Sequence, residues 1–200
     1  MKGCLIAMAV LLAILLGIGG CGVSKYNGIV TNQETVDAKW VEIRNQYKRR
    51  ADLIPNIVKT VEGARDFERE TLEAVIEKRR HVTNIQVPDS ALEDPAAVQK
   101  FLQAQQGLSS ALTRLLAVSE SYPDLKATEA FRDLTVALEG TENRIAVARH
   151  DYIESVKGYN VGIKRFPGNM IAGMFNFEAA AQLEIQGEAL EEAPAIDFGN

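Results

Sequence analysis

The chain contains few of the residues that cross-link small domains or bind metals. Its two cysteines, Cys4 and Cys21, lie within the first 21 residues, so the remaining chain has no disulfide and no cysteine-based zinc site. Its two histidines, His81 and His150, have no partners at ligand spacing, and we expect no metal. A glycine-rich phosphate loop and a nucleophile beside a base are also missing, so the sequence predicts neither a cofactor nor an enzyme.

Strand signals are missing as well, and residues 25–177 lack an excess of one charge. Alternating apolar runs between turn residues do not occur, which predicts an all-α fold. Of the 22 basic residues only Lys2 precedes residue 25, and six of the 27 acidic residues follow Phe177, so residues 25–177 hold 21 of each sign. Such a balance argues against nucleic-acid binding, which requires a basic face.

What the sequence does have is an uncharged, apolar N-terminal run. Residues 3–23 contain no charged side chain and reach the length that spans a bilayer. Lys2, the apolar stretch and the glycines before Cys21 also fit a cleaved secretory signal. A third interpretation is a bacterial lipoprotein signal, in which Cys21 becomes the acylated N-terminus. A spanning helix or several acyl chains would each tether the domain firmly to a membrane.

Three apolar stripes with helical spacing follow this segment. A capping box at residues 31–34 predicts the start of the first helix, Asp94 and Pro95 predict the start of the second, and Pro167 lies just after the third. Tight, proline-containing connections favour antiparallel neighbours over an extended coiled coil between chains. The sequence therefore predicts an antiparallel bundle of three long helices at residues 24–177, between the signal or anchor at residues 1–23 and an acidic tail at residues 178–200.

Arg50 interrupts the first stripe at a position where the heptad requires an apolar residue. An unpaired buried arginine costs roughly several kcal/mol, so a partner is expected. An antiparallel register in which facing residue numbers sum to about 190 places Glu139 and Glu142 opposite. A solvated Arg50 with its stem along the core is the alternative. Pro55, one turn later, predicts a kink because it removes a backbone N–H.

The polar residues around this position define a candidate site. A set of charged groups that converge inside a bundle can bind a ligand or catalyse a reaction. A cavity that touches these groups would favour a site over a purely structural ion pair. The candidate cluster consists of Arg49, Arg50, Asn56, Glu139, Glu142 and Asn143.

Several motifs, in order between about Tyr26 and Phe177, resemble those of the LemA family. The resemblance implies a bacterial, membrane-anchored protein of long antiparallel helices in the cell envelope, without an established activity. Relatives have been connected with membrane shaping and with envelope or stress signalling. The chain departs from the family at Tyr152-Ile153, where Tyr-Asn is usual, and in the cysteine that ends its leader. The matching motifs are Tyr26-Asn27, residues 49–58, residues 138–149, Tyr159-Asn160 and Phe166-Pro167.

Two functions from different classes remain open. The first is a non-catalytic helical scaffold, tethered in the envelope with its domain outside the cytoplasm, that binds a protein partner or other copies of itself and takes part in membrane organisation or stress signalling. The second is a small-ligand receptor or enzyme that uses the polar cluster around Arg50 and Glu142. A sensor that changes its helix packing at Pro55 is a further hypothesis.

Overall fold

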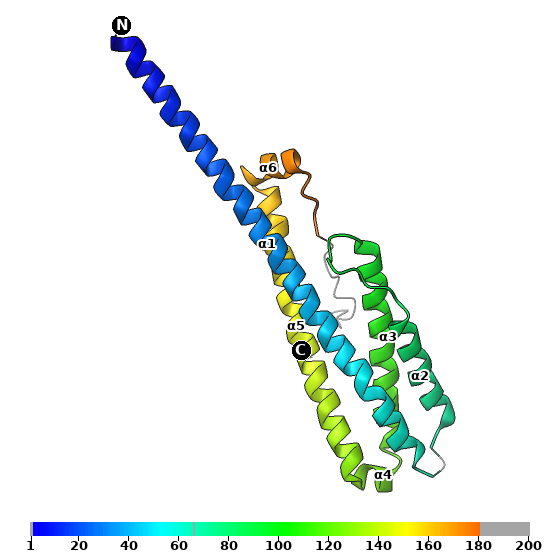
Figure 1. Ribbon diagram of the computed structural model, residues 1–200. Coiled ribbons are helices and arrows are strands. Elements are labelled where there is room, and N and C mark those ends of the chain that lie inside the picture. The colour runs from blue at the N-terminus through cyan, green and yellow to red at the C-terminus, as the bar shows by residue number, and fades with distance from the viewer. Residues whose placement is uncertain (1, 66, 181–200) are drawn as a thin grey trace, which may run out of the picture.

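The computed structural model describes residues 2–65 and 67–180, and every element within these ranges is a helix. Figure 1 shows an elongated molecule in which α1 extends far beyond the other helices. Of the acidic tail expected at residues 178–200, only residues 178–180 belong to the described part. The helices are α1 (Lys2–Glu62), α2 (Arg69–Thr83), α3 (Pro95–Ser119), α4 (Pro123–Ala127), α5 (Glu129–Lys164) and α6 (Gly168–Phe175).

Helix α1 is continuous over 61 residues, from the apolar segment into the domain. Thr31, which was expected to cap a helix start, lies inside α1, and its hydroxyl donates to the carbonyl oxygen of Asn27 at 2.9 Å. The predicted start at residues 31–34 is therefore wrong, because an uninterrupted helix leaves no free N–H groups there for a cap to satisfy. Pro55 also lies inside α1 and is exposed. A kink at Pro55 stays a prediction.

The chain reverses direction once more than the sequence predicted. The apolar pattern continues past Gly63, yet α1 ends at Glu62 and α2 runs back toward the middle of the molecule (Figure 1). Helix α2 then packs against α3, while α5 packs along α1. The additional reversal makes α1 and α5 antiparallel, whereas three helices alone would have left the first and third parallel.

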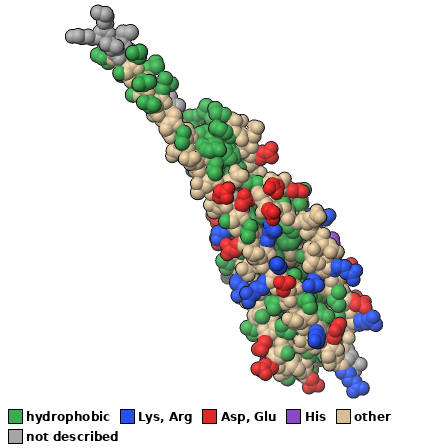
Figure 2. Space-filling view, viewed as in Figure 1, with side chains coloured by type: hydrophobic (Ala, Val, Ile, Leu, Met, Phe, Trp, Pro, Cys, Tyr) green, Lys and Arg blue, Asp and Glu red, His purple; other side chains and the backbone are tan. Residues whose placement is uncertain are grey.

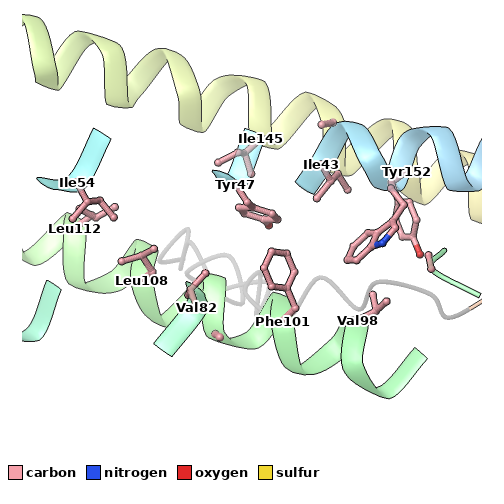
Figure 3. Packing of buried hydrophobic residues seen from close by; sticks show 14 of the residues in the cluster. Ile43, Tyr47, Ile54, Val82, Val98, Phe101, Leu108, Leu112, Ile145 and Tyr152 are labelled. Carbon is pink, nitrogen blue, oxygen red and sulfur yellow. The ribbon is translucent and has the colours of Figure 1, made fainter. Parts of the chain in front are cut away.

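Helices α1, α3 and α5 enclose the centre of the core (Figure 3). The ring of Trp40 is fully buried and packs edge-on against Phe101, with centroids 6.0 Å apart. The ring of Tyr152 packs against Trp40 in a tilted arrangement, with centroids 5.8 Å apart. Nε1 of Trp40 donates to the carbonyl oxygen of Pro88 at 3.1 Å, which satisfies the polar atom of an otherwise apolar side chain. Tyr47 packs edge-on against the same Phe101 at 5.5 Å. These aromatic contacts hold α1, α3 and α5 together just above the buried Arg50.

Candidate functional site

Arg50 is the one charged side chain that is buried in the described part of the chain, with 1% of its surface exposed. Its Nη1 donates to Oε1 of Glu142 at 2.9 Å and to the hydroxyl of Ser109. Its Nη2 donates to the carbonyl oxygen of Gln105 at 2.9 Å and to the side-chain Oε1 of the same residue. The guanidinium carbon lies 5.1 Å from the ring centroid of Tyr47. Helices α1, α3 and α5 thus each contribute to one polar centre.

The two charges of this centre differ in their exposure to water. The side chain of Glu142 is 39% exposed, whereas that of Arg50 is 1% exposed. Water therefore screens the carboxylate of Glu142. The guanidinium of Arg50 is solvated largely by the neutral acceptors on Gln105 and Ser109. Nε of Arg50 has no hydrogen-bond partner among the described residues. The arrangement suits a positive charge that is held in place by several acceptors rather than by one counterion.

A cavity of about 530 Å³ opens beside Arg50. Its volume lies in the range of small-molecule sites. The residues that line it include Tyr47, Arg50, Gln105, Glu142 and Arg149. Burial raises the pKa of Tyr47 above its ordinary 10.0, so its phenol is a neutral hydrogen-bonding group in this cavity. The cavity therefore offers the guanidinium of Arg149, a carboxylate and several amides to a ligand, whereas the Nη donors of Arg50 are already bonded within the protein.

The six residues of the predicted cluster do not form a single site. Arg50 and Glu142 meet, and Glu139 and Asn143 lie with Glu142 around a smaller cavity of about 270 Å³ between α3 and α5. Arg49 and Asn56 are exposed and line neither cavity. Helix geometry explains the separation, because consecutive side chains point about 100° apart, and Arg49 faces solvent when Arg50 faces the core.

Sequence reasoning missed the contribution of α3 to this centre. Gln105 is 2% exposed, and Ser109 lies one turn further along the same face. The signal was present, since Gln105 is a polar residue on the apolar stripe of the second predicted helix. Two polar residues that interrupt two different stripes are candidates to meet each other, whereas the assumed register pointed only to the third stripe.

A second arrangement involves the family motif residues at the opposite end of the domain. The hydroxyl of Tyr159 donates to the carbonyl oxygen of Glu178 at 2.8 Å. Asn160 exchanges two hydrogen bonds with the backbone of Ala180, from its Nδ2 at 3.0 Å and to its Oδ1 at 2.9 Å. The ring of Tyr26 packs against Phe175, with centroids 4.7 Å apart. These residues fasten α6 and the segment after it to α1 and α5.

The turn into α6 allows very little space. A Cβ atom on Gly168 would lie 2.1 Å from the carbonyl oxygen of Gly162, so only glycine fits at the first position of α6. The peptide bond between Phe166 and Pro167 is cis, and the side chain of Phe166 is exposed. Asn27, the remaining motif residue, is exposed, and its backbone oxygen accepts a hydrogen bond from the hydroxyl of Thr31. The motif residues Tyr26, Tyr159, Asn160 and Pro167 thus surround the place where α1 leaves the domain.

In the N-terminal part of α1, the side chains that the structure describes up to Cys21 are exposed. One segment of α1 is long and apolar enough to cross a membrane, and none of it is buried. Its described apolar side chains between Ile6 and Leu16 are exposed (Figure 2). The free thiol of Cys21 is exposed as well. Acylation of Cys21 stays a prediction.

The position at which the chain departs from the family lies in the core. Tyr152 is fully buried, and its hydroxyl has no hydrogen-bond partner among the described residues. Burial raises the pKa of Tyr152 to about 12. Ile153, where the family usually has asparagine, is half-buried and packs against the core.

Comparison with known proteins gives one family and a small group of relatives. The LemA family model matches residues 39–198. Magnetosome proteins MamQ 1 and MamQ 2 of Paramagnetospirillum magneticum are each 29% identical over 189 residues, which cover 86% of this chain and 67% of the relative. Magnetosome protein MamQ of Magnetospirillum gryphiswaldense is 27% identical over the same shares of both chains.

Proposed function

This chain belongs to the LemA family, and from that premise we propose that it is a helical scaffold tethered to the bacterial envelope. It is a membrane-associated helical protein. In the proposed role, residues 3–23 hold it in the membrane while the domain binds a protein partner or further copies of itself. The relatives called magnetosome proteins support a role in membrane organisation.

The observation that carries this proposal is the continuity of α1. At 1.5 Å per residue, residues 3–23 span about 31 Å, which matches a hydrocarbon core of about 30 Å. The same helix then supplies Val36, Trp40 and Ile43 to the core of the domain. The proposed anchor and the domain are thus parts of one continuous helix, which supports a scaffold that presents its partner at a set height above the membrane.

Membrane fractionation tests the tether. The full chain is expected in the membrane pellet after carbonate washing, and a chain of residues 24–200 is expected in the supernatant with a helical far-UV spectrum. A truncated chain that still pellets would show that the domain, and not residues 3–23, carries the attachment. A full chain that stays soluble would contradict the scaffold proposal altogether.

Two versions of the anchor are distinguished by Cys21. If Cys21 is acylated, Cys21→Ser blocks lipid labelling and leaves a precursor of higher mass. Unchanged mass and labelling would leave the spanning helix as the anchor. Protease treatment of spheroplasts tests the proposed placement of the domain outside the cytoplasm, since only an external domain is digested.

The cavity beside Arg50 supports a second candidate function, a receptor for a small polar ligand. Arg149 lines this cavity and can contact a ligand there. Arg49 is an exposed arginine that does not line it. A screen of small polar compounds by thermal shift is therefore read against Arg149→Gln, with Arg49→Gln as the matched control. A ligand of the cavity raises the midpoint of the native chain and of the control, and its effect is lost in Arg149→Gln.

A further inference from the structure

The outward face of α6 is apolar, whereas a helix on a water-exposed surface normally turns polar residues outward. Gly168 and Ala172 form its buried face. Met170 and Met174, one turn apart on the other face, are 62% and 74% exposed. Phe166, just before α6, is 79% exposed. Residues 166–177 contain no charged side chain, so this surface has little to offer to water.

This apolar surface lies where the anchor segment leaves the domain (Figure 2). Phe175 packs against Tyr26, and Gly168 lies against Ile29. Tyr26 is three residues beyond Val23, the end of the uncharged run, which is about 4.5 Å along the helix. Each headgroup layer of a bilayer is about 5–8 Å thick. If residues 3–23 cross the hydrocarbon core, α6 is level with the headgroups.

The charges around this surface suit the same location. Lys164 and Arg165 are exposed immediately before Phe166, and Lys25 is exposed at the start of the domain. Basic side chains at this depth are attracted to anionic headgroups, while methionine and phenylalanine enter the boundary of the acyl chains. The carboxylate of Glu178 is exposed beyond the apolar stretch, after Phe177.

We propose that α6, together with Phe166, is a second membrane-contact element that lies in the headgroup layer beside the anchor. The inference rests on the proposed anchoring by residues 3–23. A lipid surface is favoured as the occupant because the apolar patch continues the anchor segment at the same end of the molecule. The hydrogen bonds of Tyr159 and Asn160 hold the chain after α6 in place, so the element fixes the tilt of the domain as well as its height.

Site-specific photo-crosslinking of the full chain tests this. Benzoylphenylalanine is placed at Met174 and, as the matched control, at Val136, an apolar residue of α5 that is 67% exposed. The chain is incorporated into nanodiscs of phosphatidylcholine and phosphatidylglycerol at equal amounts. Lipid adducts, measured by mass, are expected at Met174 in several-fold excess over Val136. Adducts only to protein, or equal lipid yields at both positions, would overturn the inference.

A charge on the apolar face provides a second measurement. With benzoylphenylalanine at Phe166, the change Met174→Glu is expected to reduce the lipid adducts several-fold, and Val136→Glu is expected to leave them unchanged. Both replaced side chains are exposed, and a far-UV spectrum checks that the helices remain. Equal adduct yields in the two variants would contradict the placement of α6 in the headgroup layer. A chain that fails to enter the discs would contradict the anchoring proposal itself.

Discussion

The two ends of the molecule differ in where their large apolar side chains point. In the distal part, residues 40–152, most large apolar side chains point inward, the exposed ones such as Val136 and Val147 are scattered singly, and the surface carries mixed charges (Figure 2). In the proximal end, residues 24–39 and 153–180, a cluster of large apolar side chains on and beside α6 points outward. The distal part thus has the surface of an ordinary water-exposed domain. The proximal end exposes an apolar patch of the kind that contacts a membrane or another protein.

Polar groups differ between these two regions as well. The distal part buries a charge at Arg50 and surrounds it with acceptors from α3 and α5. The proximal end buries the amide of Asn160, which pairs with backbone atoms of Ala180. The first arrangement holds three long helices together, and the second holds only a short segment. Loss of the first should therefore affect the whole domain, and loss of the second should stay local.

The largest effect is expected from Arg50→Met, which should destabilise the domain by about 2–4 kcal/mol because Gln105 and Ser109 lose their donor. Half-exposed Glu142 recovers water, which keeps the cost below that of a fully buried pair. Denaturation of residues 24–200 measures the change, with exposed Arg49→Met as the control, expected within about 0.5 kcal/mol of the native chain. A double-mutant cycle with Glu142→Leu gives the coupling, and a value near zero would mean that the pair contributes nothing.

A smaller and local effect is expected from Asn160→Ala. The change removes both hydrogen bonds to Ala180 and should cost about 1–3 kcal/mol in the proximal end. Hydrogen exchange of residues 168–180 should accelerate while that of α3 stays unchanged. Exposed Asn143→Ala serves as the control. Equal acceleration throughout the domain would contradict the local character of this contact.

Tyr152→Phe should leave the distal part as stable or add up to about 1 kcal/mol, since it removes a buried hydroxyl that has no partner. Burial raises the pKa of Tyr152 from 10.0 to about 12. In the unsubstituted protein, the unfolded state therefore loses the Tyr152 proton at a lower pH than the folded state does. The free energy of unfolding thus falls as the pH rises from 10 toward 12. The variant should show a shallower fall in denaturation experiments across this range. Identical pH profiles would indicate that Tyr152 is hydrated.

The smallest effect concerns the surface ion pair at the boundary of the two regions. Nζ of Lys39 lies 2.8 Å from Asp151, and this hydrogen bond lowers the pKa of Asp151 below its ordinary 3.8. Its contribution is present above pH 3.8 and is lost as the pH falls through the lowered value. Asp151→Asn should therefore lower the thermal midpoint slightly at pH 7, and this difference should shrink as the pH falls below 3.8. A difference that persists in acid would require another cause.

Much of the helical architecture could be predicted because it depends on local signals. Asp94 accepts from the backbone N–H of Ala97 at the start of α3, and α5 ends at Lys164, shortly before Pro167, as expected. The resemblance to the LemA family is also confirmed. The reversal after Glu62 was missed because the apolar spacing continues across Gly63 and no proline marks the break. Fold class was thus predictable, and the number of long helices was not.

The candidate site was only partly predictable, for a related reason. The stripes place Arg50 opposite Glu142 once α1 and α5 are antiparallel, but they do not say that α3 brings Gln105 to the same point. The partners of Tyr159 and Asn160 are backbone atoms of residues 178–180, which carry no sequence signal. Likewise, the apolar face of α6 has a meaning only when its position beside α1 is known.

Hydrogen exchange tests the difference between the two ends most directly. The full chain in nanodiscs is compared with residues 24–200 in buffer. We predict that residues 168–177 exchange several-fold more slowly in the discs, because lipid covers α6, and that residues 101–115 of α3 exchange equally in both samples. Equal exchange at residues 168–177, with α3 unchanged, would contradict the claim that the membrane covers the apolar surface of the proximal end.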